Sequence, residues 1–219
     1  MHILKTNFHN NSNVGLFGFA TDTYCILPKN LPSTSIKQIQ EALNVPIYQT
    51  TIHNTNLIGV FCVGNEEFLF VPELIQEDEL ETLKKIPNVK VLILPTNLTA
   101  LGNNILINKK NCLVNPNLEE KAIIKLKKYG FKVKKLEIAE SSTIGSCAII
   151  TNKGCLVHRD ADNTKQIEAF FKVKTDIGTV NMGTPYIKSG IIANFNGFIT
   201  GKDTSGPEIQ RIDETLGFL

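Results

Sequence analysis

Residues 57–65 read LIGVFCVGN, and the apolar run FLFVP follows at 68–72. Gly59 is thus followed six positions later by a turn-forming asparagine and then by a short strand-like run. The same pattern starts at four other glycines, so that the anchor glycines are Gly15, Gly59, Gly102, Gly145 and Gly190. They are 44, 43, 43 and 45 residues apart. A repeat of this length is typical of propellers and solenoids.

Each repeat is predicted to contain a strand around the anchor glycine, a tight turn, a second strand, a helix and a third strand. The predicted turn residues are Thr21, Asn65, Asn108, Thr151 and Asn196. Helix signals follow at the same place in every unit. In the third unit, Asn117 and Glu120 form a predicted cap. In the last unit, Ser205 and Glu208 form a capping box and Pro207 occupies the first helical position.

The last unit lacks a third strand, whereas a spare strand-like segment precedes the first anchor at residues 2–8. We therefore expect this segment to complete the last unit and close the ring, which removes exposed sheet edges. The predicted fold is therefore α/β, a closed ring of five strand–strand–helix–strand repeats. Residues 1–219 form one closed domain with repeats at 9–52, 53–96, 97–139, 140–181 and 182–219 plus strand 2–8.

The composition is that of a globular chain, with 42% hydrophobic residues and no apolar run of 18. The N-terminus has no charged and apolar targeting segment, so a cytoplasmic protein without a membrane partner is predicted. The cysteines are Cys25, Cys62, Cys112, Cys147 and Cys155. They form no CxxC pair and lie in strand-like runs, which predicts buried thiols and neither a metal nor a cofactor.

Lysines are concentrated between residues 109 and 135, a segment that contains nine lysines and only two glutamates. One interpretation is a solvated helix face with solubilising strand edges. The other is an RNA-facing basic patch that meets the phosphate backbone, made of Lys127, Lys128, Lys132, Lys134 and Lys135. No arginine lies among these five, and Tyr129 and Phe131 are the aromatic residues between them, so sequence-specific recognition is not expected.

A catalytic function is possible for a ring of this kind, because the repeat plan resembles the pentein enzymes that act on guanidino groups. These enzymes use a cysteine near the C-terminus. Here the last cysteine is Cys155, which occupies a buried strand position, and His158 is interpreted as a strand-end residue. No nucleophile is placed beside a base, so an enzyme is not predicted. A general interaction scaffold remains a third alternative.

Five strings carry a closer resemblance. They are LTALGN at 98–103, IGVFCVGN at 58–65, TYC at 23–25, GCLVH at 154–158 and GTVNMG at 178–183. Together they resemble the translation initiation factor 6 family, the ribosome anti-association factors, over the whole chain and in its archaeal form. The family often has arginine after the second anchor glycine, where this chain has Val60.

The resemblance implies a pentein-type, five-bladed α/β propeller with pseudo-fivefold symmetry. It also implies a monomer that acts in translation initiation and subunit biogenesis. It implies binding to the large (50S) ribosomal subunit through ribosomal protein L14, near the sarcin–ricin loop. The bound factor would block the small (30S) subunit sterically. Release by a GTPase and a homologue of the Shwachman–Bodian–Diamond protein is implied by analogy.

Loops of neighbouring units are expected to project on one face and form the contact surface. The candidate ribosome-binding residues are Asn13, Asn56, Asn65, Leu101, Gly102, Asn103 and Ser142. Asn103 matches a family asparagine on the ribosome-facing surface. Its amide is expected either to bond main-chain groups of the partner or to cap a turn within the third unit.

Overall fold

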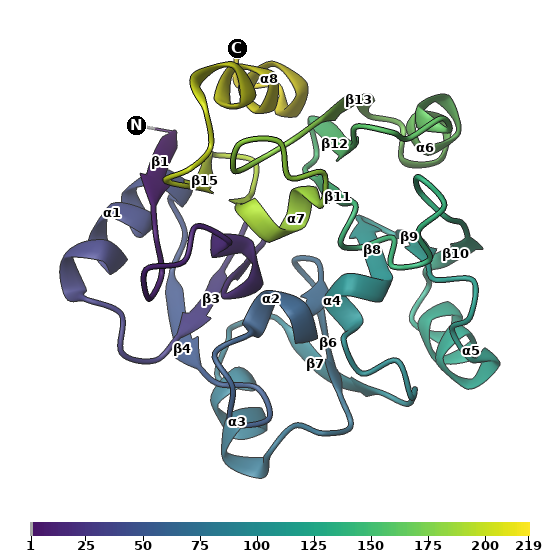
Figure 1. Cartoon of the computed structure of the whole chain (residues 1–219). Coiled ribbons are helices and arrows are strands. Elements are labelled where there is room, and N and C mark those ends of the chain that lie inside the picture. Colours follow the sequence, from purple (N-terminus) through teal and green to yellow (C-terminus); the bar gives the residue numbers. More distant parts are fainter. Residues whose placement is uncertain (1) are drawn as a thin grey trace.

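The structure is a computed structural model that describes residues 2–219. Five three-stranded sheets surround a central axis, and Figure 1 looks along this axis. In every sheet the middle strand pairs antiparallel with the inner strand and parallel with the outer strand. The predicted α/β ring of five blades is therefore confirmed.

The blades follow one another along the chain. The first three are β2 (Phe19–Ala20), β3 (Cys25–Pro28) and β4 (Ile47–Thr50); β5 (Val63–Gly64), β6 (Phe68–Pro72) and β7 (Lys90–Leu94); and β8 (Ile105–Asn108), β9 (Asn111–Val114) and β10 (Lys132–Lys135). The last two are β11 (Ala148–Ile150), β12 (Gly154–His158) and β13 (Lys174–Gly178), then β14 (Ile191–Ala193), β15 (Phe198–Gly201) and β1 (Ile3–Thr6). Long helices on the periphery follow the middle strands: α1 (Ser33–Leu43), α3 (Glu77–Leu83), α5 (Glu120–Lys128), α6 (Thr164–Phe171) and α8 (Gly206–Leu216).

The N-terminal strand closes the ring, as the sequence predicted. β1 runs parallel to β15, with Ile3 opposite Phe198 and Thr6 opposite Gly201. His2 adds a contact at the same seam, because its Nε2 lies 2.9 Å from Asp213 Oδ1. The two termini consequently lie close together in Figure 1. That the ring unfolds as one cooperative domain stays a prediction.

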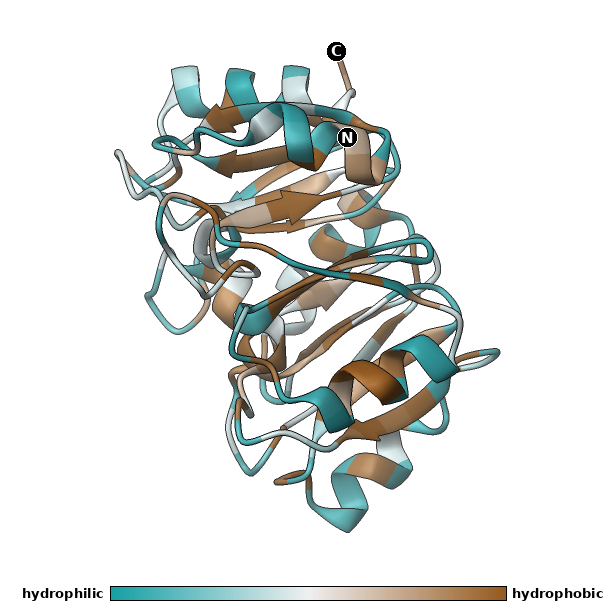
Figure 2. Ribbon diagram, turned by 90° about the vertical axis from the view of Figure 1, so that its right-hand side faces the viewer, coloured by the Kyte–Doolittle hydropathy of each residue, from teal (hydrophilic) through white to brown (hydrophobic). Residues whose placement is uncertain are grey.

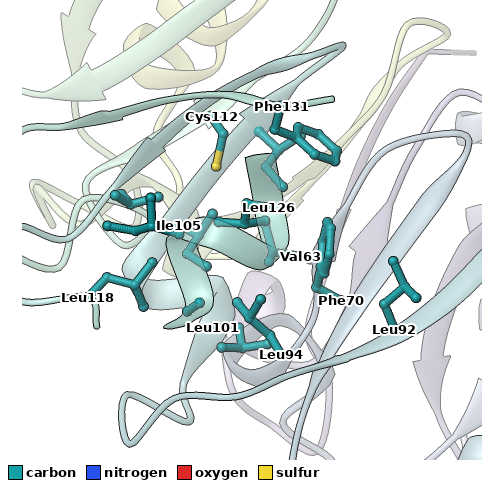
Figure 3. Close-up of a cluster of buried hydrophobic side chains, with 14 residues drawn as sticks. Val63, Phe70, Leu92, Leu94, Leu101, Ile105, Cys112, Leu118, Leu126 and Phe131 are labelled. Atoms are coloured by element: carbon teal, nitrogen blue, oxygen red, sulfur yellow. The ribbon is translucent and has the colours of Figure 1, made fainter. Parts of the chain in front are cut away.

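The core lies in the seams between blades. One cluster joins Phe70 of the second blade to Leu126 and Phe131 of the third (Figure 3). The rings of Phe70 and Phe131 meet edge to face, with centroids 5.6 Å apart. Middle strands such as β12 are buried along their whole length, so they read as continuous apolar runs. Figure 2 shows apolar strands inside and amphipathic helices around them.

The anchor glycines do not lie in strands, and this part of the prediction is wrong. Short helical turns hold them: η1 (Val14–Leu16), α2 (Ile58–Phe61), α4 (Leu101–Asn104) and, in the fourth blade, a turn around Gly145. A Cβ on Gly59 would lie 2.0 Å from the carbonyl oxygen of Gly15 in the preceding blade. Only glycine permits this approach, which explains the spacing that the sequence displays. Short apolar runs do not distinguish helix from strand.

The fifth anchor is also corrected. A Cβ on Gly59, Gly102 or Gly145 would meet the carbonyl oxygen of the preceding anchor glycine. A Cβ on Gly15 would instead lie 1.8 Å from the carbonyl oxygen of Lys188. Lys188 in α7 (Ile187–Gly190) therefore takes the anchor position, not Gly190. The fifth turn is corrected likewise, because the Oδ1 of Asn194 accepts the turn N–H groups of Asn196 and Gly197.

Helix starts were predicted with mixed success. The box of Ser205 and Glu208 caps α8 as expected, with proline in the first turn. The predicted cap at Asn117 is wrong, since Glu119 is the N-cap of α5. Within residues 2–219 no helix combines the length and apolarity needed to cross a bilayer.

Candidate functional site

The two ends of the ring axis differ in the elements that form them. The helical end consists of η1, α2, α4, α7 and the turn at residues 144–147, with the loops that precede them. The turn end consists of the tight turns around Thr21, Asn65, Asn108, Thr151 and Asn194. Figure 1 shows α2, α4 and α7 gathered around the axis.

A hollow of about 340 Å³, here called the axial bowl, opens at the centre of the helical end. Its lining residues are Asn13, Gly15, Leu16, Gly59, Asn103, Ser146, Thr184, Tyr186, Lys188 and Ser189. Two predicted binding residues, Asn13 and Asn103, thus lie together in it. Leu101 and Gly102 are buried in α4 beneath the surface. Asn56 and Ser142 are partly exposed in the loops before the second and fourth anchors.

Asn103 and its neighbour Asn104 make different use of the same side chain. The Asn104 side chain is buried; its amide donates to the Ala100 carbonyl oxygen and its Oδ1 accepts from Asn115. The Asn103 side chain is partly exposed and makes no hydrogen bond within residues 2–219. Its backbone carbonyl, in contrast, accepts from Gly145 N–H at 2.9 Å. The turn of the third unit is therefore held by Asn104.

Asn65 does not join the other predicted residues. It lies at the turn end, is buried, and lines a second axial cavity of about 80 Å³. Its Oδ1 accepts from the N–H groups of Glu67 and Phe68, and its amide donates to the Lys109 carbonyl at 2.7 Å. These bonds make Asn65 a structural turn residue that joins the second blade to the third.

Carboxylates at helix N-termini hold the loops of the helical end. Glu79 accepts from the backbone N–H groups of His53 and Asn54, each at 2.8 Å. Glu119 and Glu208 bind the equivalent loops at Asn97 and at residues 182–183. Burial is the largest influence on the pKa of Glu208 and raises it, but the hydrogen bonds outweigh burial and leave this pKa below its usual 4.5.

Two exposed apolar side chains at the helical end escaped the sequence reasoning. Met182 is 80% exposed at a loop tip, and Tyr186 is 48% exposed beside the bowl. The tip is a tight turn in which both Asn181 and Met182 have positive φ. Methionine is unusual in such a turn, where glycine or asparagine is favoured, and this was the available signal. Both residue types are enriched at protein interfaces.

The lysine-rich third blade lies away from the bowl. Lys132, Lys134 and Lys135 belong to β10, the outer edge strand of its sheet. Lys127 and Lys128 are exposed in the last turn of α5. Tertiary structure adds a third aromatic residue to Tyr129 and Phe131 of the same segment, because the ring centroid of Phe170 lies 5.8 Å from the Lys132 ammonium. Lysines on an edge strand discourage pairing with other chains, which agrees with the solubilising interpretation.

The five cysteines are unsuited to nucleophilic chemistry. All five cysteines are buried and free, and burial raises the pKa of each thiol, that of Cys62 to about 12. His158 Nδ1 accepts from the Asp160 N–H, as expected for a strand-end residue. Burial lowers the pKa of His158. Among residues 2–219 no group of three His, Cys, Asp or Glu side chains is placed to hold a metal ion.

These features define a five-bladed α/β propeller with an open bowl at one end of its axis. The sequence model of the eIF-6 family matches residues 3–215, and the chain belongs to this family of translation factors. Translation initiation factor 6 of Saccharolobus islandicus is 36% identical, over 99% of this chain and 100% of the relative. That of Sulfolobus acidocaldarius is 39% identical over 97% of both chains, and that of Pyrococcus horikoshii 34% over 100% of both.

Solved structures with a similar arrangement include enzymes. Agmatine deiminase of Campylobacter jejuni with bound substrate aligns at a TM-score of 0.49 and 13% identity, over 76% of this chain and 67% of that chain. DDAH of Pseudomonas aeruginosa aligns at 0.48 and 13%, over 75% and 69%. These likenesses are too weak to say anything about chemistry in this chain.

Proposed function

We propose that this protein binds the large ribosomal subunit through its helical end and prevents the small subunit from joining. The mechanism is steric occlusion, which requires shape and affinity and needs no reacting group. Membership in a family of translation factors over residues 3–215 supports this proposal. The partners implied by the resemblance are ribosomal protein L14 and the region of the sarcin–ricin loop.

The observation that carries the proposal is the free amide of Asn103. A partly exposed amide with both donor and acceptor capacity is suited to bond the main chain of a partner. Asn104 already holds the local turn, so the fold itself makes no use of the Asn103 side chain. Asn103 also lies in the bowl with Asn13, and Asn56 and Ser142 are at equivalent loop positions.

The helical end has the size and chemistry of a docking surface. A specific interface buries roughly 800 Å² on each partner, which several adjacent loops can supply. Met182 and Tyr186 add exposed apolar surface at its rim, and buried aromatic anchors contribute much of the affinity at interfaces. The proposal extends to cytoplasmic action as a monomer and to roles in subunit biogenesis as well as initiation. Release would use a GTPase and a homologue of the Shwachman–Bodian–Diamond protein.

The decisive experiment is sedimentation of the purified protein with cognate ribosomal subunits at varied magnesium and salt. Comigration with the large subunit and loss of the joined particle are expected. If the protein stays at the top of the gradient while joining is unaffected, the proposal is wrong and only the family fold remains.

A pair of neighbouring variants makes the test specific for the site. Asn103→Ala should weaken large-subunit binding about tenfold, as interface truncations often do, and leave the melting temperature nearly unchanged. Asn104→Ala should lower stability by about 2 kcal/mol, because Asn115 and the Ala100 carbonyl lose their partner. Lost stability with intact binding in Asn103→Ala would assign Asn103 to the turn instead.

A further inference from the structure

Lys188 interrupts the ring of anchor glycines. In four blades the anchor has no side chain, because the carbonyl oxygen of the neighbouring blade occupies that space. Only the fifth blade has a lysine at this position, 43 residues after Gly145. The Lys188 carbonyl oxygen contacts Gly15, just as each anchor carbonyl contacts the anchor glycine of the next blade. The Lys188 side chain therefore begins close to the axis of the ring.

The lysine side chain crosses the centre of the molecule. Its ammonium Nζ donates to the Gly102 carbonyl oxygen at 2.6 Å, which links the fifth blade to the third. Among the described residues, Lys188 alone lines both the axial bowl and the smaller cavity toward the turn end. It therefore separates the two cavities and forms the floor of the bowl.

This ammonium has no counter-charge within the protein. Within residues 2–219 no carboxylate oxygen lies within 4 Å of it, and only one of its three N–H groups has a protein acceptor. Burial lowers the pKa of the Lys188 amine to about 8, and the nearby Cys62 thiol offsets this only in part. An enclosed charge without a partner is unfavourable, and it favours any anion that can reach it.

The bowl gives an anion that access from the docking side. None of its lining residues is acidic, and its polar members are asparagine, serine and threonine. Asn103 also lines the bowl, so a group that enters it would meet both the Asn103 amide and the Lys188 ammonium.

We propose that Lys188 binds one carboxylate of the partner protein that docks on the helical end. This inference rests on the proposed function and names the chemistry of one contact. The bowl contains a single cation, whereas a nucleic-acid surface needs several to neutralise its phosphates. The apolar rim of Met182 and Tyr186 likewise suits a protein. Charge-assisted hydrogen bonds of this kind are the stronger ones at interfaces.

The test compares the affinities of two matched lysine variants for purified cognate large subunits. Lys188→Met removes the charge and keeps the length, and it should bind at least tenfold more weakly than the wild type. Lys132→Met makes the same charge change on the outer edge of the third blade and should bind like the wild type. Lys188→Gly places the anchor residue of the other four blades in the fifth, and it is the second variant if the Lys188→Met protein does not fold.

The outcomes separate the two proposals. If the wild type binds and both Lys188 variants bind within about twofold of it, Lys188 only separates the two axial cavities and this inference is wrong. Equal weakening by Lys132→Met would also overturn it, since the effect would be general charge. Failure of the wild type to bind would instead defeat the proposed function.

A pH series adds a readout that a purely structural lysine would not move. The advantage of the wild type over Lys188→Met should fade between pH 7 and about 9.5, as the amine loses its proton. Cys62 stays protonated through most of this range, because burial raises its pKa to about 12. A constant advantage across the range would contradict the ion pair.

Discussion

The two ends of the propeller axis are built from the same repeat but use their polar side chains differently. At the turn end, the side-chain amides of Asn65 and Asn194 donate hydrogen bonds to backbone carbonyls of neighbouring blades. At the helical end, Asn103 and Lys188 retain hydrogen-bonding capacity that the protein does not use. The turn-end amides are thus used within the ring, whereas these two groups at the helical end remain available to a partner.

The contrast extends to the backbone. Loops at the helical end are fixed through carboxylates such as Glu79 and Glu208, so their tips can present side chains to a partner without being loose. The turn end fixes its tips through the turn residues themselves. Rigid presentation reduces the entropy lost on binding, and this favours the helical end as the docking surface.

The largest effect is expected when the ring is opened. A chain that begins at Asn10 lacks β1, leaves β15 paired with β14 alone and loses the buried Phe8 side chain. Both ends should then lose their geometry together, because domain stability is only about 5–15 kcal/mol. Circular dichroism should show no cooperative thermal transition. A melt like that of the intact protein would mean that closure is dispensable.

The next effect concerns the seam under the bowl. Gly59→Val should destabilise the protein by about 3 kcal/mol, since its Cβ would overlap the Gly15 carbonyl. Urea unfolding measures this change. Gly206→Ala is the control, because no atom lies within 4 Å of its Cβ position, and it should stay within about 0.5 kcal/mol of the wild type. Similar stabilities for both variants would show that the seam tolerates a side chain.

At the turn end, Asn194→Ala should lower the free energy of unfolding by about 2 kcal/mol and leave large-subunit affinity unchanged. The Thr21 and Leu43 carbonyls each lose the Asn194 amide as a donor, although Leu43 keeps that of Asn196. The backbone N–H groups of Asn196 and Gly197 lose their acceptor. Together with Asn103→Ala, this variant separates stability from binding. Weakened binding by fully folded Asn194→Ala would place the contact surface at the wrong end.

Acid stability reports the loop clamps of the helical end. The folded pKa of Glu208 lies below its usual 4.5, so its contribution is present above that pH and is lost as pH falls through the folded pKa. Glu208→Gln should be less stable by about 2 kcal/mol at neutral pH. The difference from the wild type should shrink in urea titrations below pH 4.5. A difference independent of pH would assign the loss to packing.

The smallest effect is expected on the outer edge. Lys132→Glu combined with Lys134→Glu should change stability by less than about 0.5 kcal/mol and leave subunit binding intact at low salt. Both lysines lie on β10, the outer edge strand of the third blade, which is at the periphery of the ring in Figure 1. A large loss of affinity for the large subunit that grows at low salt would support the RNA-facing interpretation of this patch.

The blades could be predicted from the sequence because the same steric requirement recurs in each repeat. Glycine recurs where carbonyls crowd the next blade, and turn formers recur six residues later, so the ring was readable from spacing. It failed locally where short apolar runs fit either a helix or a strand, as at Ile58–Phe61. It grouped Asn65 with Asn103 by residue type, although they lie at opposite ends of the axis.

The chain by itself determined the number of blades, their order and the closure by residues 2–8, because periodic side-chain volumes and a missing strand are visible in one dimension. Only the tertiary structure decided which side chains are satisfied. Asn103 and Asn104 are adjacent and identical in sequence, yet packing buries one amide and leaves the other free. The glycine pattern pointed to Gly190, whereas the meeting of five blades places the Lys188 ammonium on the axis.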